Sequence, residues 1–209
     1  MISLIHIAEC ALPAISEKIA LRYAGDHNPT TETLLLLKDC IKECNGIFSQ
    51  KAVYRILPIE RRRDELLIGG MNIKSDALMK NLQGCDTVVI FAASAGFGID
   101  RLIAKYSKIS PAKALLLHGI GTERVEALCD SFCELLASQM NLRLAPRFSP
   151  GYGDLPLGIQ KEVLNLLNAS KTLGIGLNSS MLLSPAKTVT AFAGIKTKEC
   201  DLNEFQRIP

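Results

Sequence analysis

Tryptophan is absent from this 209-residue sequence, and histidine occurs only three times. The three histidines, His6, His27 and His118, are far apart in the chain. Histidine metal centres and Ser-His-Asp triads need imidazoles held close to acidic or nucleophilic partners. The sequence therefore predicts neither kind of site.

An excess of one charge is also lacking, because 24 Lys and Arg residues face 21 Asp and Glu residues and leave a net charge of +3. We find no basic face interleaved with aromatic side chains, which is typical of nucleic-acid-binding domains. Arg61, Arg62 and Arg63 form a short basic run, but Asp64 and Glu65 follow it directly. A hydrated turn is the favoured interpretation of this run, and we expect no nucleic-acid partner.

Long hydrophobic runs are missing as well. No apolar stretch reaches the ~18 residues that a helix needs to cross a bilayer. The N-terminal segment is interrupted by His6, Glu9 and Glu17 and has no basic region of the kind that opens a secretory signal. These features predict a cytoplasmic protein without membrane attachment.

Cysteine is present, but the seven residues include no Cys-x-x-Cys motif and do not suggest a disulfide framework. Cys40/Cys44 and Cys129/Cys133 are each four apart, which places each pair on one helix face. Such pairs can hold a metal. Cys129, however, shares its face with Phe132 and other apolar residues, which favours a place in the core. We therefore assign no metal ligands.

Hydrophobic residues make up 48% of the chain, which is ample for a buried core. Gly119-Ile120-Gly121 is expected to separate two helices, with His118 at the end of the first. Strand 188–192 alternates apolar and polar residues, which is typical of a half-buried strand. Periodicity and turn residues predict helices at 14–23, 30–44, 111–117 and 122–140, a further helix beginning at Ser75-Asp76, and a strand at 51–58.

Residues 86–93 form the clearest strand, apolar on both faces and therefore central in its sheet. Gly96-Phe97-Gly98 and a helix follow, the order found in dinucleotide-binding folds. Arg101, however, occupies the third position of that fingerprint, where a glycine permits close packing. A nucleotide-binding enzyme that uses this helix N-terminus stays an alternative hypothesis.

The stretch Arg147-Phe148-Ser149-Pro150-Gly151-Tyr152 joins a predicted strand at 141–145 to a predicted helix at 156–168. It presents a planar cation, backbone N–H groups and an aromatic ring at one turn. This combination suits a small ligand with a carboxylate and a flat ring. The alternative is a plain strand-to-helix connector, in which Pro and Gly serve the backbone alone.

Several motifs occur in a fixed order along the chain. They are Ser75-Asp76, residues 86–93, Asp100-Arg101, Val125-Glu126-x-x-x-Asp130, Arg147-x-x-x-Gly151-Tyr152 and Leu177-x-x-Ser180-x-x-x-x-Pro185-x-x-x-Val189-Thr190. This order resembles the C-terminal activation domain of cobalamin-dependent methionine synthase, in particular its short stand-alone bacterial forms, over about residues 51–194. The resemblance implies an α+β fold, a twisted and largely antiparallel sheet with surrounding helices. It also implies a helical N-terminal extension at 1–50, packed on an activation-type domain at 51–209.

The resemblance also implies a function: a trans-acting reactivation module that binds S-adenosylmethionine for the reductive methylation of cob(II)alamin. The partner would be cobalamin-dependent methionine synthase or another corrinoid methyltransferase, with a flavodoxin-like electron donor. Cobalamin would be reached only through that partner, because the Asp-x-His-x-x-Gly motif is absent here. The chain would be a component of a methyltransferase, with no catalytic residue of its own. The implied ligand-binding residues are Arg147, Phe148, Ser149, Gly151 and Tyr152.

The chain also departs from the family's larger members. Those members place an aspartate near their N-terminus against the ligand's ammonium group, and no matching segment is found here. They carry a tyrosine pair where this chain has Asp201-Leu202, and the cysteine cluster of the small members is reduced to Cys200. These departures motivate the alternative of a non-catalytic partner of a corrinoid methyltransferase that has lost ligand binding.

Overall fold

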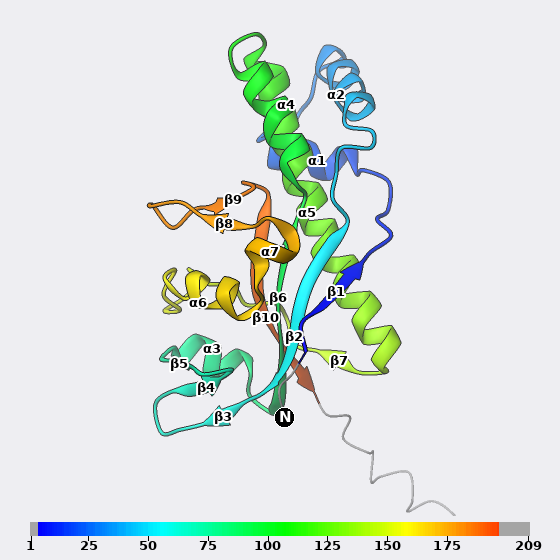
Figure 1. Cartoon of the computed structure of the whole chain (residues 1–209). Helices are drawn as coiled ribbons and strands as arrows, with labels where there is room; N and C mark the ends of the chain where they lie inside the picture. Colours follow the sequence, from blue (N-terminus) through cyan, green and yellow to red (C-terminus); the bar gives the residue numbers. More distant parts are fainter. Residues whose placement is uncertain (1–3, 197–209) are drawn as a thin grey trace, which may run out of the picture.

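A five-stranded sheet runs through the centre of the computed structural model, which describes residues 4–196 (Figure 1). Each neighbouring pair of strands in this sheet is antiparallel. Helices cover both faces of the sheet (Figure 1), so the predicted α+β class is confirmed. The strands lie in the order β1 (His6–Glu9), β2 (Lys51–Pro58), β6 (Cys85–Ser94), β10 (Thr188–Lys196) and β7 (Arg143–Leu144).

Strands β6 and β10 form the core of the sheet, with Ala191 opposite Phe91 in their register. The predictions for 86–93 and 51–58 are confirmed, because β6 is flanked on both sides and β2 has the predicted bounds. The half-buried prediction for 188–192 is wrong. Nearly all of β10 is buried, because β6 and β7 flank it and apolar clusters cover both faces of the sheet.

One face of the sheet packs on a layer of short elements (Figure 1). Val88, Ile90 and Phe192 point to this side and are fully buried. Ser75 caps the first helix of the layer, since its hydroxyl accepts a hydrogen bond from the Leu78 N–H at 3.0 Å. The layer comprises β3 (Glu60–Arg61), β4 (Leu66–Ile68), β5 (Met71–Ile73), α3 (Asp76–Asn81), α6 (Ile159–Leu166) and α7 (Ala169–Leu173).

The opposite face packs on one long helix, α5 (Pro111–Met140). Val89, Phe91 and Ala193 point to this side, one residue out of step with the first face, as the period of a strand requires. The rings of Phe91 and Phe132 lie 4.8 Å apart and join sheet to helix. The α5 stripe that contains Cys129 is therefore core, as predicted.

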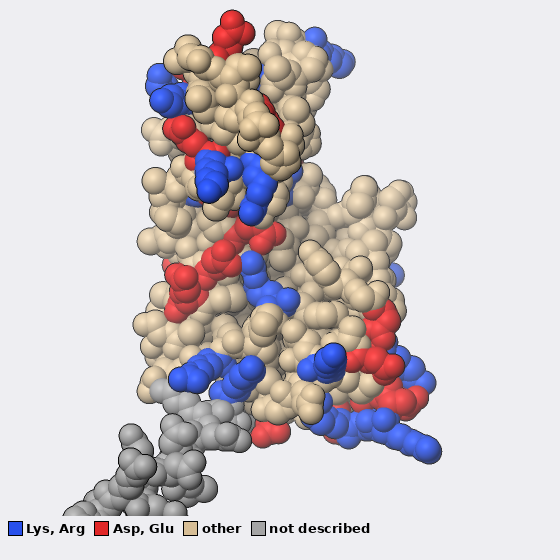
Figure 2. Space-filling model, turned by 180° about the vertical axis from the view of Figure 1, so that it is seen from behind, with Lys and Arg blue, Asp and Glu red and all other residues tan. Residues whose placement is uncertain are grey.

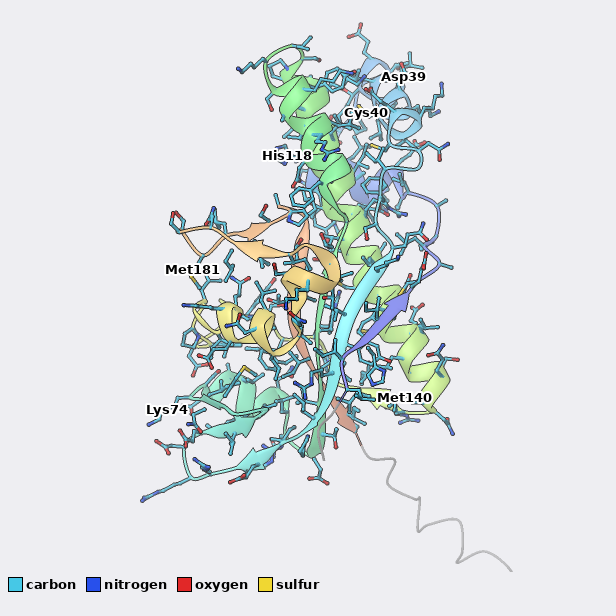
Figure 3. The ribbon with its side chains drawn as sticks, viewed as in Figure 1. Asp39, Cys40, Lys74, His118, Met140 and Met181 are labelled. Atoms are coloured by element: carbon cyan, nitrogen blue, oxygen red, sulfur yellow. The ribbon has the colours of Figure 1, made fainter. Side chains whose placement is uncertain are left out.

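Helix α5 extends past the end of the sheet, where it packs with α1 (Glu17–Tyr23), α2 (Thr31–Glu43) and α4 (Phe97–Ser107) (Figure 1). We call these four helices the helical arm. Thr30 caps α2, because its hydroxyl accepts a hydrogen bond from the Thr33 N–H at 3.2 Å. His118 lies within α5 in this arm (Figure 3), so its predicted place at a helix end is wrong.

The prediction that Gly119-Ile120-Gly121 separates two helices is also wrong, because α5 continues through these residues. A Cβ atom on Gly119 would lie 2.2 Å from the carbonyl oxygen of Ala20, and one on Gly121 would lie 2.9 Å from Ile99. These glycines let α1 and α4 approach the backbone of α5 closely. These glycines therefore serve helix packing. A sequence interpreted one element at a time does not show which helices come into contact.

The N-terminal residues supply β1 as well as helices α1 and α2. Strand β1 pairs with β2 from His6↔Tyr54 to Glu9↔Lys51, so this segment belongs to the same sheet as the core. The domain division at residue 50 stays a prediction. A small hairpin of β8 (Gly176–Leu177) and β9 (Leu183–Ser184) precedes β10 and carries Met181 near its tip (Figure 3).

Candidate functional site

The predicted ligand turn leaves the sheet at Phe148. Phe148 exchanges two backbone hydrogen bonds with Phe192 of β10, at 2.9 and 2.8 Å, and its ring packs against the core. The chain then turns back on itself, with Gly151 N–H donating to the Leu155 carbonyl at 2.9 Å. Gly151 has φ +90°, a conformation that disfavours other residues, so this glycine is required by the turn itself.

Asp154 fastens the turn to the start of α3. One oxygen of its carboxylate accepts a hydrogen bond from the Asp76 N–H at 2.7 Å, and the other accepts from the Ser75 hydroxyl and the Ala77 N–H. These hydrogen bonds, that of Ser75 foremost, lower the pKa of Asp154. Ser75-Asp76 and the turn, two motifs far apart in the sequence, are thus one structural unit.

A pocket of about 380 Å³ opens beside this turn, within the size range of small-ligand sites. The turn, β10, α6 and α5 each contribute to its wall. Its lining combines a cation and an anion with hydroxyl and apolar groups. The lining residues are Glu126, Arg147, Ser149, Pro150, Tyr152, Leu157, Gln160, Leu183, Thr188, Val189 and Thr190.

Arg147 is held at this wall by two carboxylates of α5. Its Nη2 donates to Asp130 Oδ1 at 2.8 Å and to Glu126 Oε2 at 3.1 Å. Its Nη1 is buried without an oxygen or nitrogen partner, so the guanidinium has donor capacity that the two acids do not use. Burial acts to lower the pKa of Arg147, but Cys129, Asp130 and Glu126 outweigh it and raise the pKa.

The Cys129 thiol lies beside the same guanidinium. Burial raises the pKa of Cys129 to about 12, although Arg147 acts in the opposite direction. The thiol is therefore neutral at physiological pH and an inert neighbour. The charge balance at this wall depends on Arg147 and its two carboxylates.

The five predicted ligand residues lie together, but they do not contribute equally. Arg147, Ser149 and Tyr152 line the pocket, and Tyr152 is 65% exposed at its rim. Gly151 shapes the turn, while the Phe148 N–H that we expected to reach a ligand is already bonded to β10. Ligand binding by these residues stays a prediction.

The predicted ligand residues did not include several polar residues of the pocket, among them Glu126 and Gln160. Glu126 and Asp130 are four apart, so the motif that contains them could have identified a single acidic helix face. Gln160 is buried and donates to the Met181 carbonyl at 3.3 Å, which ties α6 to the β8–β9 hairpin. No periodic signal marks this glutamine.

A second hollow of about 860 Å³ lies on the other side of Arg147 and Glu126, which line both cavities. Glu123, Asp130 and Glu134 add acidic groups to this hollow. Figure 2 shows a band of acidic side chains across this part of the molecule, with basic side chains next to it. Arg147 thus separates the pocket from an acidic surface.

Other motifs have structural explanations in the described part of the chain. A Cβ atom on Gly98 would lie 2.5 Å from the Ile47 carbonyl oxygen, so this glycine permits close packing. Among residues 4–196, no group of His, Cys, Asp and Glu side chains is arranged to hold a metal ion. The described helices include none that is long and apolar enough to span a membrane. Cys200 and Asp201-Leu202 lie outside the described residues.

No protein-family model and no curated protein sequence matches this chain. The structure, in contrast, is similar to a crystal structure of the MetH reactivation domain bound to AdoHcy, with a TM-score of 0.71. The match covers 91% of this chain and 78% of that chain, at 14% sequence identity. The chain therefore has the fold of that reactivation domain, as the resemblance in its motifs implied.

Proposed function

We propose that this protein binds S-adenosylmethionine and serves as a trans-acting reactivation module for a cobalamin-dependent methionine synthase or another corrinoid methyltransferase. The observation that carries the proposal is the pocket beside the Arg147–Tyr152 turn, with a guanidinium at its wall. It occurs in a chain with the fold of a domain whose crystal structure contains AdoHcy, the demethylated form of the same ligand.

The residues present fit the ligand by chemistry. Arg147 would bind a methionine carboxylate through charge-assisted hydrogen bonds, in exchange for one of the two α5 carboxylates on its Nη2. Leu157, Val189 and Leu183 supply apolar wall for a flat purine, and the exposed ring of Tyr152 offers a stacking surface at the rim. Ser149 adds a polar group at the turn.

In this role the chain contributes placement. Bound S-adenosylmethionine would supply the methyl group, while the corrinoid partner would hold cob(II)alamin and a flavodoxin-like donor would supply one electron. Because orientation raises the effective concentration of reacting groups strongly, the fixed turn would hold the ligand where the partner's cobalt can reach it. This role places the protein in the cytoplasm, with the methionine biosynthetic enzyme that it serves.

Isothermal titration calorimetry tests ligand binding directly, with AdoHcy and S-adenosylmethionine as ligands. Arg147→Ala removes the charge-assisted contact and should weaken binding about 10- to 100-fold. Arg143→Ala, on exposed β7 four residues away, is the matched control and should bind as the wild type does. Absence of wild-type binding up to millimolar ligand would refute the proposal.

One observation favours a second function, that of a structural partner without a ligand. Both acidic residues near Arg147 already bind it, so the guanidinium is neutralised in this structure. If this pairing is permanent, Arg147→Ala should leave co-purification with a corrinoid methyltransferase and the activity of that enzyme unchanged. Loss of activity with retained co-purification would instead support ligand binding.

A further inference from the structure

The two edges of the central sheet differ in length. Strand β7 forms one edge and has only two residues, and such short strands are a common protection against further pairing. Strand β1 forms the other edge with four residues (Figure 1). Among residues 4–196, β1 pairs with β2 and with no other strand. One long side of β1 is therefore an unpaired strand edge in the described structure.

The backbone of β1 presents its hydrogen-bonding groups in an alternating pattern. The N–H of Cys10, which directly follows the strand, donates to the Gln50 carbonyl at 2.8 Å. Alternate residues of an antiparallel strand direct their N–H and C=O groups to the same side. His6 and Ala8 therefore direct these groups toward β2, whereas Ile7 and its odd-numbered neighbours direct theirs away from the sheet.

The side chains along this edge are apolar. Leu4, Ile5 and Ile7 are exposed, Ile7 to 53%. Natural edge strands are commonly protected by lysine, proline, a bulge or an inward-pointing charge. No lysine or proline occurs in β1, and its register with β2 is continuous. The carboxylate of the strand, that of Glu9, has Lys51 opposite it on β2, so this edge carries no net excess of charge.

We infer that β1 is a dimerisation surface, at which two copies of this chain join their sheets by antiparallel pairing of β1 with itself. Strand addition satisfies an open edge with backbone hydrogen bonds, and the flanking side chains select the partner. This edge fits an apolar strand without a net charge rather than a basic or acidic segment, and β1 is such a strand. A two-fold contact lets each copy pair the outward N–H and C=O groups of the other. The inference holds whichever ligand the pocket takes.

The pattern of β1 also specifies the register of the pairing. Outward-directed residues must pair with outward-directed residues, so the two-fold axis passes at a residue and not between two residues. An axis at Ile7, Ala8 or Glu9 sets Glu9 opposite an isoleucine or opposite itself. An axis at His6 sets Ile5 opposite Ile7 of the partner subunit, so that apolar side chains meet. The dimer therefore has its axis at His6.

This contact leaves the ligand pocket of each copy open. Strands β2 and β6 separate β1 from β10, which contributes to the pocket wall. The pocket lining contains residues of neither β1 nor β2. Dimerisation at β1 thus places the two pockets on separate parts of one continuous sheet.

Sedimentation velocity of the full chain over about 1–100 μM tests this surface. The wild type should change from monomer to dimer within that range. Ile7→Lys places a charge in the pairing and should weaken the dimer at least about 100-fold. Ile109→Lys is the matched control, because Ile109 is an equally apolar, exposed residue between α4 and α5, and it should dimerise as the wild type does. A wild type that stays monomeric overturns the inference, and so does wild-type affinity in Ile7→Lys.

Cross-linking tests the register independently. His6 would face its own copy in a non-hydrogen-bonded pair, with Cα atoms about 4.5 Å apart, a distance that a disulfide can bridge. His6→Cys should therefore form a covalent dimer with oxidised glutathione. The wild type, which has seven cysteines of its own, and Leu115→Cys, an exposed position on α5, should not. Equal cross-linking in all three proteins, or none in His6→Cys, would refute pairing about His6. Circular dichroism verifies that each variant keeps its fold.

Discussion

At the scale of a single residue, the proposed ligand group Arg147 is already held by charged partners. A guanidinium that is 24% exposed has lost part of its hydration, and two carboxylates of α5 compensate for that loss. Because one of its nitrogens lacks an oxygen or nitrogen partner, the compensation is incomplete. In the proposed complex, the ligand carboxylate would replace Glu126 or Asp130 on Nη2.

Asp154 is predicted to be the residue that keeps the turn in its binding shape. Asp154→Asn removes the charge that accepts hydrogen bonds from Ser75, Asp76 and Ala77. We expect AdoHcy affinity to fall about fivefold to tenfold, because the turn that presents Arg147 loses its attachment to α3. Calorimetry on the variant measures the effect.

Asp64→Asn is the control for this experiment, since Asp64 pairs with Lys74 on the surface and is remote from the pocket lining. The control should bind as the wild type does. Equal affinities of Asp154→Asn and the wild type would show that the turn keeps its shape without this attachment.

At the residue scale, sequence reasoning brings chemical groups together where they lie within one short segment. Arg147, Ser149 and Tyr152 lie within six residues and all reach the pocket wall. Glu126 was not predicted as a pocket residue, because it lies 21 positions earlier and meets Arg147 only after α5 packs on the sheet. Phe148 differs from the other residues of the turn, because its backbone N–H, which was expected to reach a ligand, donates to Phe192 of β10, and its ring packs on the core.

At the scale of elements, α5 connects the sheet to the helical arm. Gly119→Ala would place a methyl group against the carbonyl oxygen of Ala20, and α1 would have to move. We expect a loss of about 1–3 kcal/mol in the free energy of unfolding, the usual cost of overpacking. Urea-induced unfolding followed by circular dichroism measures it.

Gly158→Ala is the matched control, because no atom lies within 4 Å of a Cβ at that position and its φ is −56°. The control should be neutral or slightly stabilising. A Gly119→Ala variant as stable as this control would mean that α1 and α5 are not packed as closely as described.

Glu43 ties three helices of the arm together and gives their packing a defined pH dependence. It accepts hydrogen bonds from Lys113 at 2.6 Å, from Tyr106 at 2.8 Å and from Lys105 at 3.2 Å. These contacts, that of Lys113 first, lower the pKa of Glu43 from 4.5 to about 2. Because the folded pKa is depressed, the stabilisation is complete above pH 4.5 and is lost as the pH falls toward 2.

Glu43→Gln should therefore lower the free energy of unfolding by about 1–2 kcal/mol at neutral pH. The difference from the wild type should stay constant down to about pH 5 and shrink below it. Denaturant unfolding at several pH values checks this, with Glu32→Gln, in the exposed first turn of the same helix, as the control. A difference that grows in acid would contradict the assignment.

Two helix starts with side-chain caps were predicted well, whereas other limits of the elements were not. Thr30 and Ser75 mark helix starts by side-chain caps, a local signal that sequence carries. The predicted strand at 141–145 is reduced to Arg143–Leu144, and the helix predicted from residue 156 begins at Ile159. Pairing with β10 sets the limits of this strand, and that pairing is not local.

At the scale of the whole molecule, the sheet brings together segments that are far apart in sequence. Strands β2, β6 and β10 are neighbours, although about 130 residues separate the first from the last. Periodicity identified these strands, but their order depends on long-range pairing, so the fold class came from the resemblance of motifs rather than from patterns. The pocket is formed where this sheet, α5 and α6 meet.

The proposed role predicts an activity of the whole protein in trans. Added to a corrinoid methyltransferase in the inactive cob(II)alamin state, with S-adenosylmethionine and a reduced flavodoxin, it should restore turnover. Arg147→Ala should reduce the reactivation rate at least about tenfold at ligand concentrations that do not saturate the variant, because ligand occupancy falls. The cobalamin absorption spectrum follows the reaction. Reactivation without this protein at the same rate would contradict the role.

The most direct measurement is a crystal structure of the protein grown with AdoHcy. The account predicts the ligand in the pocket beside the Arg147–Tyr152 turn, with its carboxylate on the Arg147 guanidinium. A ligand bound elsewhere, or an empty pocket at saturating AdoHcy with Arg147 still paired to Glu126 and Asp130, would contradict it.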